Sequence, residues 1–210
     1  MKQKQEKIRE LGFTLWEMLF VVGILAVFYA LVIGNFGQAR VSQNLKIGQN
    51  ELVTNIQKAR SYSLSGRQMN GFVPKFYIVR LETSANGGNP RGYAMQGIAN
   101  DTNNNLDVYY DGNPNANLEN SNFPQNVFVQ ELMISRGGIN YFPSCVQVAF
   151  AAPYGKTYID ETCAINQIYT NGATLGSKAN GTLTVTLVRD GSTTVRKVLV
   201  YGLSGRIEAQ

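Results

Sequence analysis

Histidine is absent from this chain of 210 residues, which removes the side chain that most often acts as a general base or a metal ligand near neutral pH. Any catalysis would have to rest on carboxylates, lysine, tyrosine, serine or cysteine. The sequence contains no Gly-x-Ser-x-Gly block and no glycine-rich phosphate-binding loop, the motifs typical of many hydrolases and nucleotide-binding proteins. We therefore expect that the protein is not an enzyme and needs no cofactor.

Charged residues are also scarce, at 16% of the chain, and the formal net charge is only +5. Hydrophobic residues make up 44%, and glycine occurs 21 times. A chain with this much apolar surface and this little charge does not have the composition of an intrinsically disordered protein. We expect one globular domain of ordinary size, rich in strands and turns, beyond the N-terminal segments.

The longest stretch without a charged residue runs from Met18 to Ala39. It is long enough for a helix of ~20 residues to cross a bilayer. Residues 1–12 ahead of it carry four basic and two acidic side chains, and this basic excess predicts that the leader stays in the cytoplasm while the rest is exported. An ordinary secretory signal is shorter and is cut after its apolar stretch, whereas a cut ahead of this stretch would keep the membrane helix in the mature protein.

A single carboxylate, Glu17, stands at the edge of the apolar stretch, where it costs several kcal/mol unless it is neutralised. The order of a basic leader, the block Gly-Phe-Thr-Leu-Trp-Glu at residues 12–17 and an apolar helix resembles the N-terminus of type IV prepilins, a family that includes the pseudopilins of type II secretion. The resemblance implies that a prepilin peptidase cuts between Gly12 and Phe13, and that the amine of Phe13 is then methylated.

It further implies that Glu17 pairs with that amine on a neighbouring subunit. A buried ammonium and a buried carboxylate each cost several kcal/mol alone and much less as a pair. Trp16 departs from the family pattern, which usually has a smaller aliphatic residue there. The alternative interpretation is a signal anchor with an isolated glutamate.

Helical periodicity continues past the apolar stretch, and the repeat is amphipathic. The apolar or small side chains of one face are Val41, Leu45, Gly48, Leu52, Ile56, Ala59 and Ser63. We expect this face to pack against a head domain, so that one long helix runs from Phe13 to about Ser65. Gly34 and Gly37 each cost ~1 kcal/mol of helix stability relative to alanine, so we expect local melting there, and two helices with a bend are the alternative.

From Gly71 onward the sequence changes to short runs of Val, Ile, Tyr and Phe separated by Gly, Asn and Pro, which is typical of antiparallel strands. The predicted strands are Phe72–Glu82, Gly92–Ile98, Asp107–Tyr110, Val127–Ser135, Cys145–Phe150, Ile165–Tyr169, Thr182–Arg189 and Thr194–Tyr201. The pair Asp190-Gly191 predicts a hairpin turn between the last two strands. We expect the strands to form a meander.

The predicted fold class is therefore α+β, with a long N-terminal α-helix packed on an antiparallel β-sheet head, as the resemblance to pilins also implies. The predicted segments are a cleaved leader (1–12), a transmembrane and assembly helix (13–37), an amphipathic helix (38–66) and a β-rich head (67–210).

Only two cysteines occur, Cys145 and Cys163, both in the part expected to be exported. In an oxidising compartment an isolated pair most often forms a disulfide, and closing a loop of this size stabilises a protein by ~3 kcal/mol in the chain-entropy account. We predict this disulfide. The alternative is two separate buried thiols.

Asparagine is concentrated between Asn100 and Asn126, which predicts a long exposed loop. Oxygen-bearing side chains alternate within it at Asp101, Asn103, Asn105 and Asp107, the spacing with which a turning loop can point ligands at one calcium ion. Leu106 stands where an EF-hand loop has glycine, and Gly112 stands where it has a bidentate glutamate. The alternative to a calcium site is a turn capped by asparagine side chains.

Four loose motifs follow one another in the order found in minor pilins of the GspH/FimT type. They are Ala59-Arg60-Ser61 through Gly66, Gly92-Tyr93 leading to residues 101–105, Val148-Ala149-Phe150 with Pro153-x-Gly155, and Val200 through Gly205-Arg206-Ile207. This resemblance implies a minor pilin or pseudopilin, a structural subunit of a type IV pilus or type II secretion filament that polymerises through its N-terminal helix and is placed at the tip or initiates it. A major pilin subunit is an alternative.

The same resemblance implies a single-pass protein of the inner, cytoplasmic membrane before assembly, and a filament at the cell surface or in the periplasm afterwards. The implied partners are other pilin or pseudopilin subunits, the prepilin peptidase and the inner-membrane assembly platform.

A second functional interpretation adds DNA as a ligand of the head, because some relatives of this type serve DNA uptake. Its support is a group of basic residues near the C-terminus: Lys178, Arg189, Arg196, Lys197 and Arg206. A phosphate-binding patch needs such clustering. Arginine and lysine scattered along strands more often form a solvated face.

Overall fold

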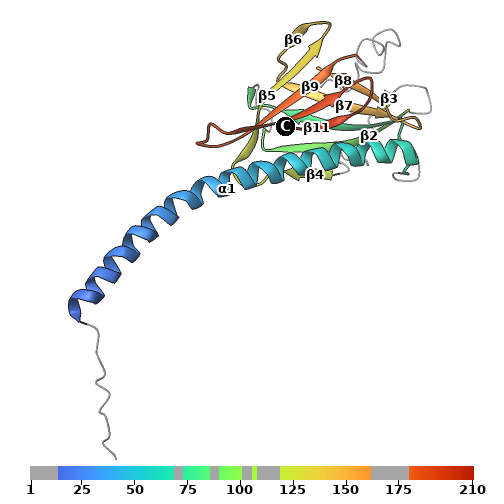
Figure 1. The fold of residues 1–210 in the computed structure, drawn as a ribbon. Helices are drawn as coiled ribbons and strands as arrows, with labels where there is room; N and C mark the ends of the chain where they lie inside the picture. Colours follow the sequence, from blue (N-terminus) through green and yellow to red (C-terminus); the bar gives the residue numbers. More distant parts are fainter. Residues whose placement is uncertain (1–13, 69–72, 86–89, 101–105, 108–118, 162–179) are drawn as a thin grey trace, which may run out of the picture. The chain divides into compact units, whose positions relative to one another are not determined.

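The computed structural model describes residues 14–68, 73–85, 90–100, 106–107, 119–161 and 180–210 (Figure 1), and only the backbone of residues 33–39, 99–100, 106–107 and 119–120. The chain divides into two compact units, Met1–Arg40 and Val41–Gln210. The first unit contains the apolar part of the helix. The second contains the rest of the helix and all the strands.

A single helix, α1, extends from Leu15 to Ser65. Its backbone is helical through Gly34 and Gly37, so the predicted local melting is wrong and the alternative of two helices is not observed. Helix formation is cooperative, and adding a residue to an existing helix costs far less than starting one. Two glycines in a helix of 51 residues therefore lower its stability without ending it.

The described strands form two antiparallel sheets. The six-stranded sheet contains β1 (Phe76–Glu82), β2 (Gly92–Asn100), β3 (Leu106–Asp107), β4 (Glu119–Asn122), β7 (Cys145–Ala151) and β8 (Lys156–Asp160), in the order β3-β2-β1-β7-β8 with β4 also paired to β2. The five-stranded sheet contains β5 (Val127–Arg136), β6 (Ile139–Tyr141), β9 (Thr182–Arg189), β10 (Val195–Tyr201) and β11 (Ile207–Ala209), in the order β11-β10-β9-β5-β6.

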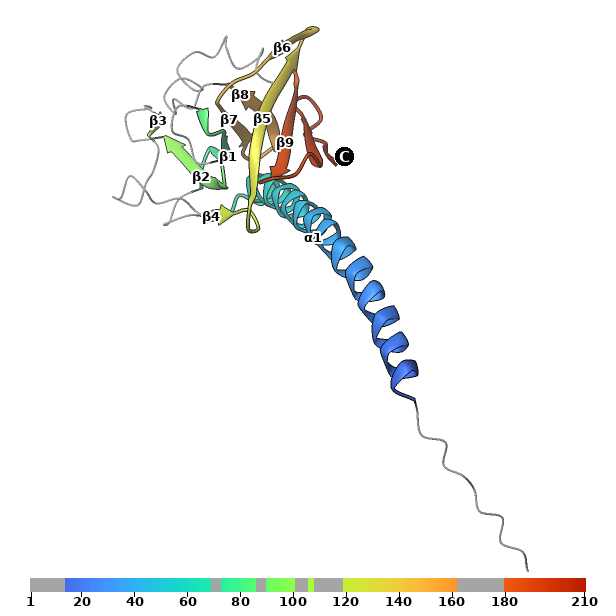
Figure 2. The ribbon, with the colours of Figure 1, turned by 90° about the vertical axis from the view of Figure 1, so that its left-hand side faces the viewer.

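The α+β class is thus observed, but the predicted simple meander is wrong. Strand β1 pairs with β7, and β5 pairs with β9, so each sheet joins strands that are distant in sequence. Figure 2 looks along the C-terminal half of α1 and shows β1, β2, β7 and β8 on one side and β5 and β9 on the other. Local alternation of side chains fixes the strands but carries no information on these long-range pairings.

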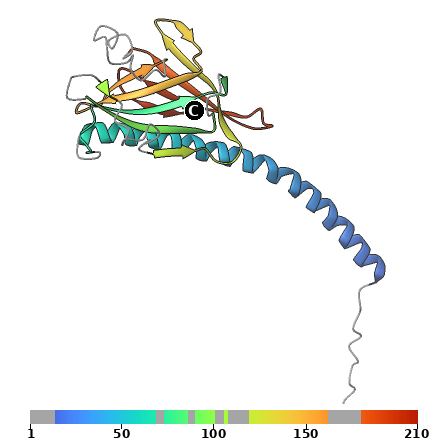
Figure 3. The same ribbon diagram turned by 180° about the vertical axis from the view of Figure 1, so that it is seen from behind.

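The predicted amphipathic face of α1 is confirmed. Leu45, Leu52, Ile56 and Ala59 are fully buried and belong to one core with the inner faces of both sheets. Figure 3 shows this half of the helix running beside the strands. Burial of such side chains contributes about 1.5–3 kcal/mol each for the larger ones, so the helix is an integral part of the head.

Most predicted strands are confirmed, with shifted ends. The first begins at Phe76 rather than Phe72, and the third is limited to Leu106–Asp107 within the described residues. The strand predicted at Ile165–Tyr169 lies outside the described residues. Four strands were not predicted: β4, β6, β8 and β11, which have five residues or fewer. The first of them falls within the loop predicted for residues 100–126.

A β-bulge explains why β5 has no simple alternation. Its register with β9 shifts between Val129 and Glu131, so Val127 and Val129 on one side of the bulge and Leu132 and Ile134 on the other all face the core. An extra residue in one strand reverses the alternation locally. As a result of the bulge, the consecutive residues Gln130 and Glu131 both lie at the surface.

Candidate functional site

The first turn of α1 is closed by a reciprocal pair of side chains. The carboxylate of Glu17 accepts hydrogen bonds from the Thr14 backbone N–H at 2.8 Å and from the Thr14 hydroxyl at 2.9 Å, and the Glu17 N–H donates to the Thr14 hydroxyl oxygen at 3.3 Å. This is a capping box, which satisfies N–H groups that have no partner in the helix. The Thr-x-x-Glu spacing at residues 14–17 is visible in the sequence and indicates this cap, a role of Glu17 that was not predicted.

The segment Leu15–Val32 of α1 is long and apolar enough to cross a membrane, and none of it is buried within the described structure. Its side chains are exposed all round the helix, for example Trp16 at 77% and Phe20 at 69%. A helix that is apolar on every side is normally covered by lipid or by other protein rather than by water. By length and composition, this one segment could span a membrane.

A groove interrupts the surface of this segment at Gly23. It has a volume of about 380 Å³ and is lined by Leu19, Phe20, Gly23, Ile24, Val27 and Phe28. A Cβ atom added to Gly23 would meet no other atom within 4 Å, so the missing side chain leaves room on the outside of the helix. Small residues allow a second helix to approach closely in an apolar medium.

Polar contacts fix the second half of α1 to the head. The Gln49 side-chain amide donates to the carbonyl oxygens of Lys197 at 2.7 Å and Gln210 at 2.8 Å. Arg60 donates to the carbonyl oxygen of Gly205 at 2.9 Å. Gly48 lies against Pro124 and Val127, where an added Cβ atom would come within 3.2 Å of each. This second half of the helix is therefore held to the head at several points, by contacts that helical periodicity does not reveal.

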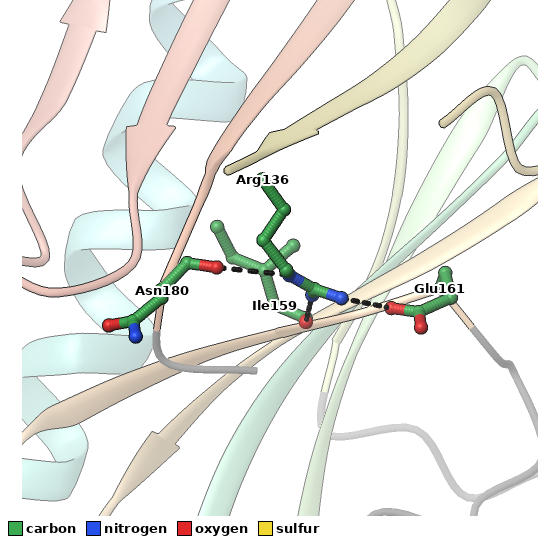
Figure 4. Close-up of polar contacts among 4 residues, drawn as sticks. All are labelled: Arg136, Ile159, Glu161 and Asn180. Carbon is green, nitrogen blue, oxygen red and sulfur yellow. Dashed lines mark hydrogen bonds and ion pairs between the residues drawn. The ribbon is translucent and has the colours of Figure 1, made fainter. Parts of the chain in front are cut away.

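Arg136 connects both sheets at one end of the head (Figure 4). Its guanidinium donates to the carbonyl oxygens of Ile159 in β8 at 2.7 Å and of Asn180 at 2.9 Å, and it forms an ion pair with Glu161 at 3.2 Å. The Arg136 side chain is 18% exposed. Glu161 and Asn180 flank residues 162–179, so one side chain from β5 holds the residues before and after that segment. No local pattern around Arg136 indicates this role, because its partners are distant in sequence.

Tyr77, in β1, is another buried residue with a polar group, and its hydroxyl lies just beyond the C-terminal end of α1. Its hydroxyl donates to the carbonyl oxygen of Arg67, and its ring meets that of Tyr62 edge-on at 6.0 Å between centroids. Burial raises the pKa of Tyr77, and the nearby Arg67 charge partly offsets this. The hydroxyl therefore stays protonated and serves as a hydrogen-bond donor.

The structure brings together only some of the described basic residues that were predicted as a DNA patch. Arg189, the last residue of β9, lies at the same end of the β9–β10 pair as Arg196 and Lys197, which are near the start of β10, whereas Arg206 follows the far end of β10. The Tyr201 N–H donates to the Arg206 carbonyl oxygen, so the part of β10 between Lys197 or Arg196 and Tyr201 separates them from Arg206 by about 13–17 Å at 3.3 Å per residue. Arg206 also pairs with Glu208 and lies over the Tyr201 ring. Lys178 lies outside the described residues.

The other predicted site residues are described only in part. Gly12, Phe13, Asp101, Asn103 and Asn105 lie outside the described residues, and Asp107 belongs to strand β3, where it pairs with Ala99. Within the described ranges, no three His, Cys, Asp or Glu side chains are grouped so as to hold a metal ion.

The predicted disulfide is likewise described at one end only. Cys145, at the start of β7, takes part in a disulfide. Cys163, the other cysteine of the chain, lies outside the described residues, so the pairing of the two stays a prediction.

Comparison with protein-family models, with curated proteins and with solved structures gave no match to this chain.

Proposed function

We propose that this chain is a structural subunit of a filament of the type IV pilin and pseudopilin class, anchored in the cytoplasmic membrane before assembly and polymerised through the N-terminal half of α1. The observation that carries the proposal is that one helix serves two environments. Its first part, Leu15–Val32, buries nothing within the described structure, and its later turns form part of the core of the head.

The exposed part of α1 offers features suited to packing against other helices. A membrane anchor alone needs only apolar surface, whereas this segment also carries a carboxylate at its start and the groove at Gly23. The carboxylate is expensive in an apolar filament interior unless a cation pairs with it. A free amine at Phe13 of a neighbouring subunit would supply that cation, four residues ahead of Glu17 in its own chain.

The placement of the sequence motifs supports a minor subunit. Three of the four motifs that resemble minor pilins of the GspH/FimT type meet at one end of the head. A Cβ atom added to Gly155 would lie 2.8 Å from Leu64 at the end of α1, and one added to Gly205 would lie 2.6 Å from Thr157 and 3.1 Å from Arg60. We propose that this end of the head belongs to the filament tip or faces the next subunit. The implied partners are other subunits, the prepilin peptidase and the inner-membrane assembly platform.

N-terminal mass spectrometry of the protein taken from cells tests the proposal. We expect a mature chain that begins at Phe13 and carries a methyl group on its amine. Replacing Gly12 by a bulky residue should block this processing, because the peptidase must accommodate the residue next to the cut bond. A chain in sheared filaments that still begins at Met1, or that begins within the apolar helix, would overturn the proposal.

A further inference from the structure

A small pocket with a mixed polar and apolar lining opens in the head between the two sheets. It has a volume of about 280 Å³, and its lining includes Thr83, Gln130, Glu131, Phe142, Pro143 and Ser144. Pockets for drug-sized ligands usually measure about 300–1,000 Å³, so this one has the size to receive a protein side chain. The bulge of β5 places Gln130 and Glu131 at its rim.

Two features of the pocket indicate what it can bind. Phe142, an aromatic residue of the lining, is 62% exposed. Glu131 is also exposed, and none of the ion pairs among the described residues involves it. An aromatic ring beside a carboxylate favours a ligand with one flat apolar group and one cation.

The turn between β7 and β8 presents groups of this kind. Tyr154 is 86% exposed, the largest exposed fraction of any described large hydrophobic side chain. Lys156 follows two residues later, is exposed, and forms none of the ion pairs among the described residues, although its ammonium lies 5.4 Å from the centroid of the Tyr158 ring. Gly155 between them rests on Leu64, so the end of α1 braces the turn.

The pocket and the turn lie at opposite ends of one strand. Ser144 of the pocket immediately precedes β7, and Tyr154 follows its end at Ala151. Seven residues of strand span about 23 Å at 3.3 Å per residue. One head cannot bring its own turn to its own pocket, but two heads stacked end to end along β7 can.

We propose that the pocket receives the β7–β8 turn of a second copy of this chain, with Tyr154 of one copy against Phe142 of the other and Lys156 paired with Glu131. The contact joins two different surfaces, so it can repeat from copy to copy without closing. The inference rests on the proposed function, because it names the partner surface of a filament subunit.

Site-specific photo-cross-linking in the full chain, expressed in cells, tests the contact. Tyr154 is replaced by p-benzoylphenylalanine, and we expect an ultraviolet-dependent dimer whose cross-linked peptide contains residues 142–144 or 130–132. Glu131→Lys should reduce the dimer about fivefold, because an exposed ion pair contributes up to ~1 kcal/mol and the variant replaces it by repulsion. Adding Lys156→Glu to Glu131→Lys should restore it, since the charges are then exchanged.

Two control positions are also exposed to solvent but lie outside the proposed contact. The photoreactive residue at Thr193, in the turn between β9 and β10, should give no such dimer, and Glu51→Lys on the exposed side of α1 should leave the Tyr154 cross-link unchanged. Cross-links from position 154 to another part of the chain, to a different protein or to nucleic acid would overturn the contact. So would a dimer that Glu131→Lys does not weaken.

Filament incorporation, measured in the same cells, separates this inference from the proposed function. Normal incorporation without the Tyr154 cross-link rejects the head contact alone. A chain that is not cleaved after Gly12 rejects the filament proposal, whether or not the heads contact each other.

Discussion

Glu17 and Thr14 form a closed pair at the start of α1, in which the carboxylate accepts two hydrogen bonds from Thr14, at 2.8 and 2.9 Å. The carboxylate that we propose as the partner of a neighbouring amine is therefore already held in place by its own helix. A carboxylate has about four lone-pair positions, so it can keep this cap and accept the amine as well. The cap then orients the group for assembly.

Mutation can separate the contribution of the helix cap from that of the Glu17 charge. Both Glu17→Ala and Thr14→Ala remove the cap, at about 1 kcal/mol of helix stability each, but only Glu17→Ala removes the negative charge. We expect Glu17→Ala to insert into the membrane normally and to be lost from sheared filaments, while Thr14→Ala is incorporated almost as well as the unmodified chain. Equal incorporation of the two variants, measured by immunoblot, would show that the charge is not used between subunits.

The predicted bond between Cys145 and Cys163 should brace the head without affecting processing. Alkylation with and without prior reduction, followed by mass measurement, should find two protected sulfurs in protein from the cell surface. The double variant Cys145→Ser, Cys163→Ser should lower the unfolding free energy by ~3 kcal/mol, while cleavage after Gly12 continues, because the peptidase acts on the leader. Free thiols in the native protein would contradict the bond.

Arg136 should be among the most sensitive positions of the head. Arg136→Ala removes hydrogen bonds to two carbonyl oxygens and leaves Glu161 without this partner, so we expect a loss of about 2–3 kcal/mol in unfolding free energy. Arg136→Lys keeps the charge but lacks the planar fork and should recover only part of it. Glu161→Gln, at a partly exposed carboxylate, should cost ~1 kcal/mol or less. A loss for Glu161→Gln as large as that for Arg136→Ala, measured by urea unfolding, would mean that the ion pair, rather than the carbonyl contacts, is what matters.

Two glycines with left-handed backbones differ in their surroundings. Gly205 has φ +62°, and a Cβ atom there would lie 2.6 Å from the Thr157 hydroxyl oxygen, whereas Gly191, at φ +72°, has nothing within 4 Å. Gly191→Ala should cost about 1–2 kcal/mol from backbone conformation alone. Gly205→Ala should cost clearly more, because the β10–β11 turn must move away from β8. Thermal melting of the two variants side by side gives the comparison.

The raised pKa of Tyr77 predicts that the protein loses stability at high pH. Burial raises its pKa, so the folded state holds the hydroxyl proton more tightly than the unfolded state. This contribution is fully present below the ordinary tyrosine pKa of about 10 and is lost as the pH rises through the folded value. The unfolding free energy of Tyr77→Phe should depend less on pH above about 10 than that of the unmodified chain. Tyr154→Phe, at an exposed ring, should leave the pH dependence unchanged.

The sequence by itself determined the features that depend on neighbours along the chain. The apolar stretch after Glu17 indicated a membrane-length helix, and steps of three and four from Val41 to Ser63 identified the buried face of α1, because helix geometry repeats every 3.6 residues. Runs of β-branched and aromatic residues located most of the longer strands. The Thr-x-x-Glu cap was equally local and was readable from the same block of residues.

Tertiary structure alone decided what depends on long-range pairing. The separation of the strands into two sheets follows from β1 pairing with β7 and β5 with β9; neither pairing leaves a local trace, since any two strands of matching alternation can pair. Strands such as β6 and β11 are too short for a periodic signal. Arg196, Lys197 and Arg206 are close in sequence but lie at opposite ends of a strand, because an extended chain carries neighbours apart. Arg136, Ile159 and Asn180 are distant in sequence but meet around one guanidinium, because folding brings the ends of three strands to one place.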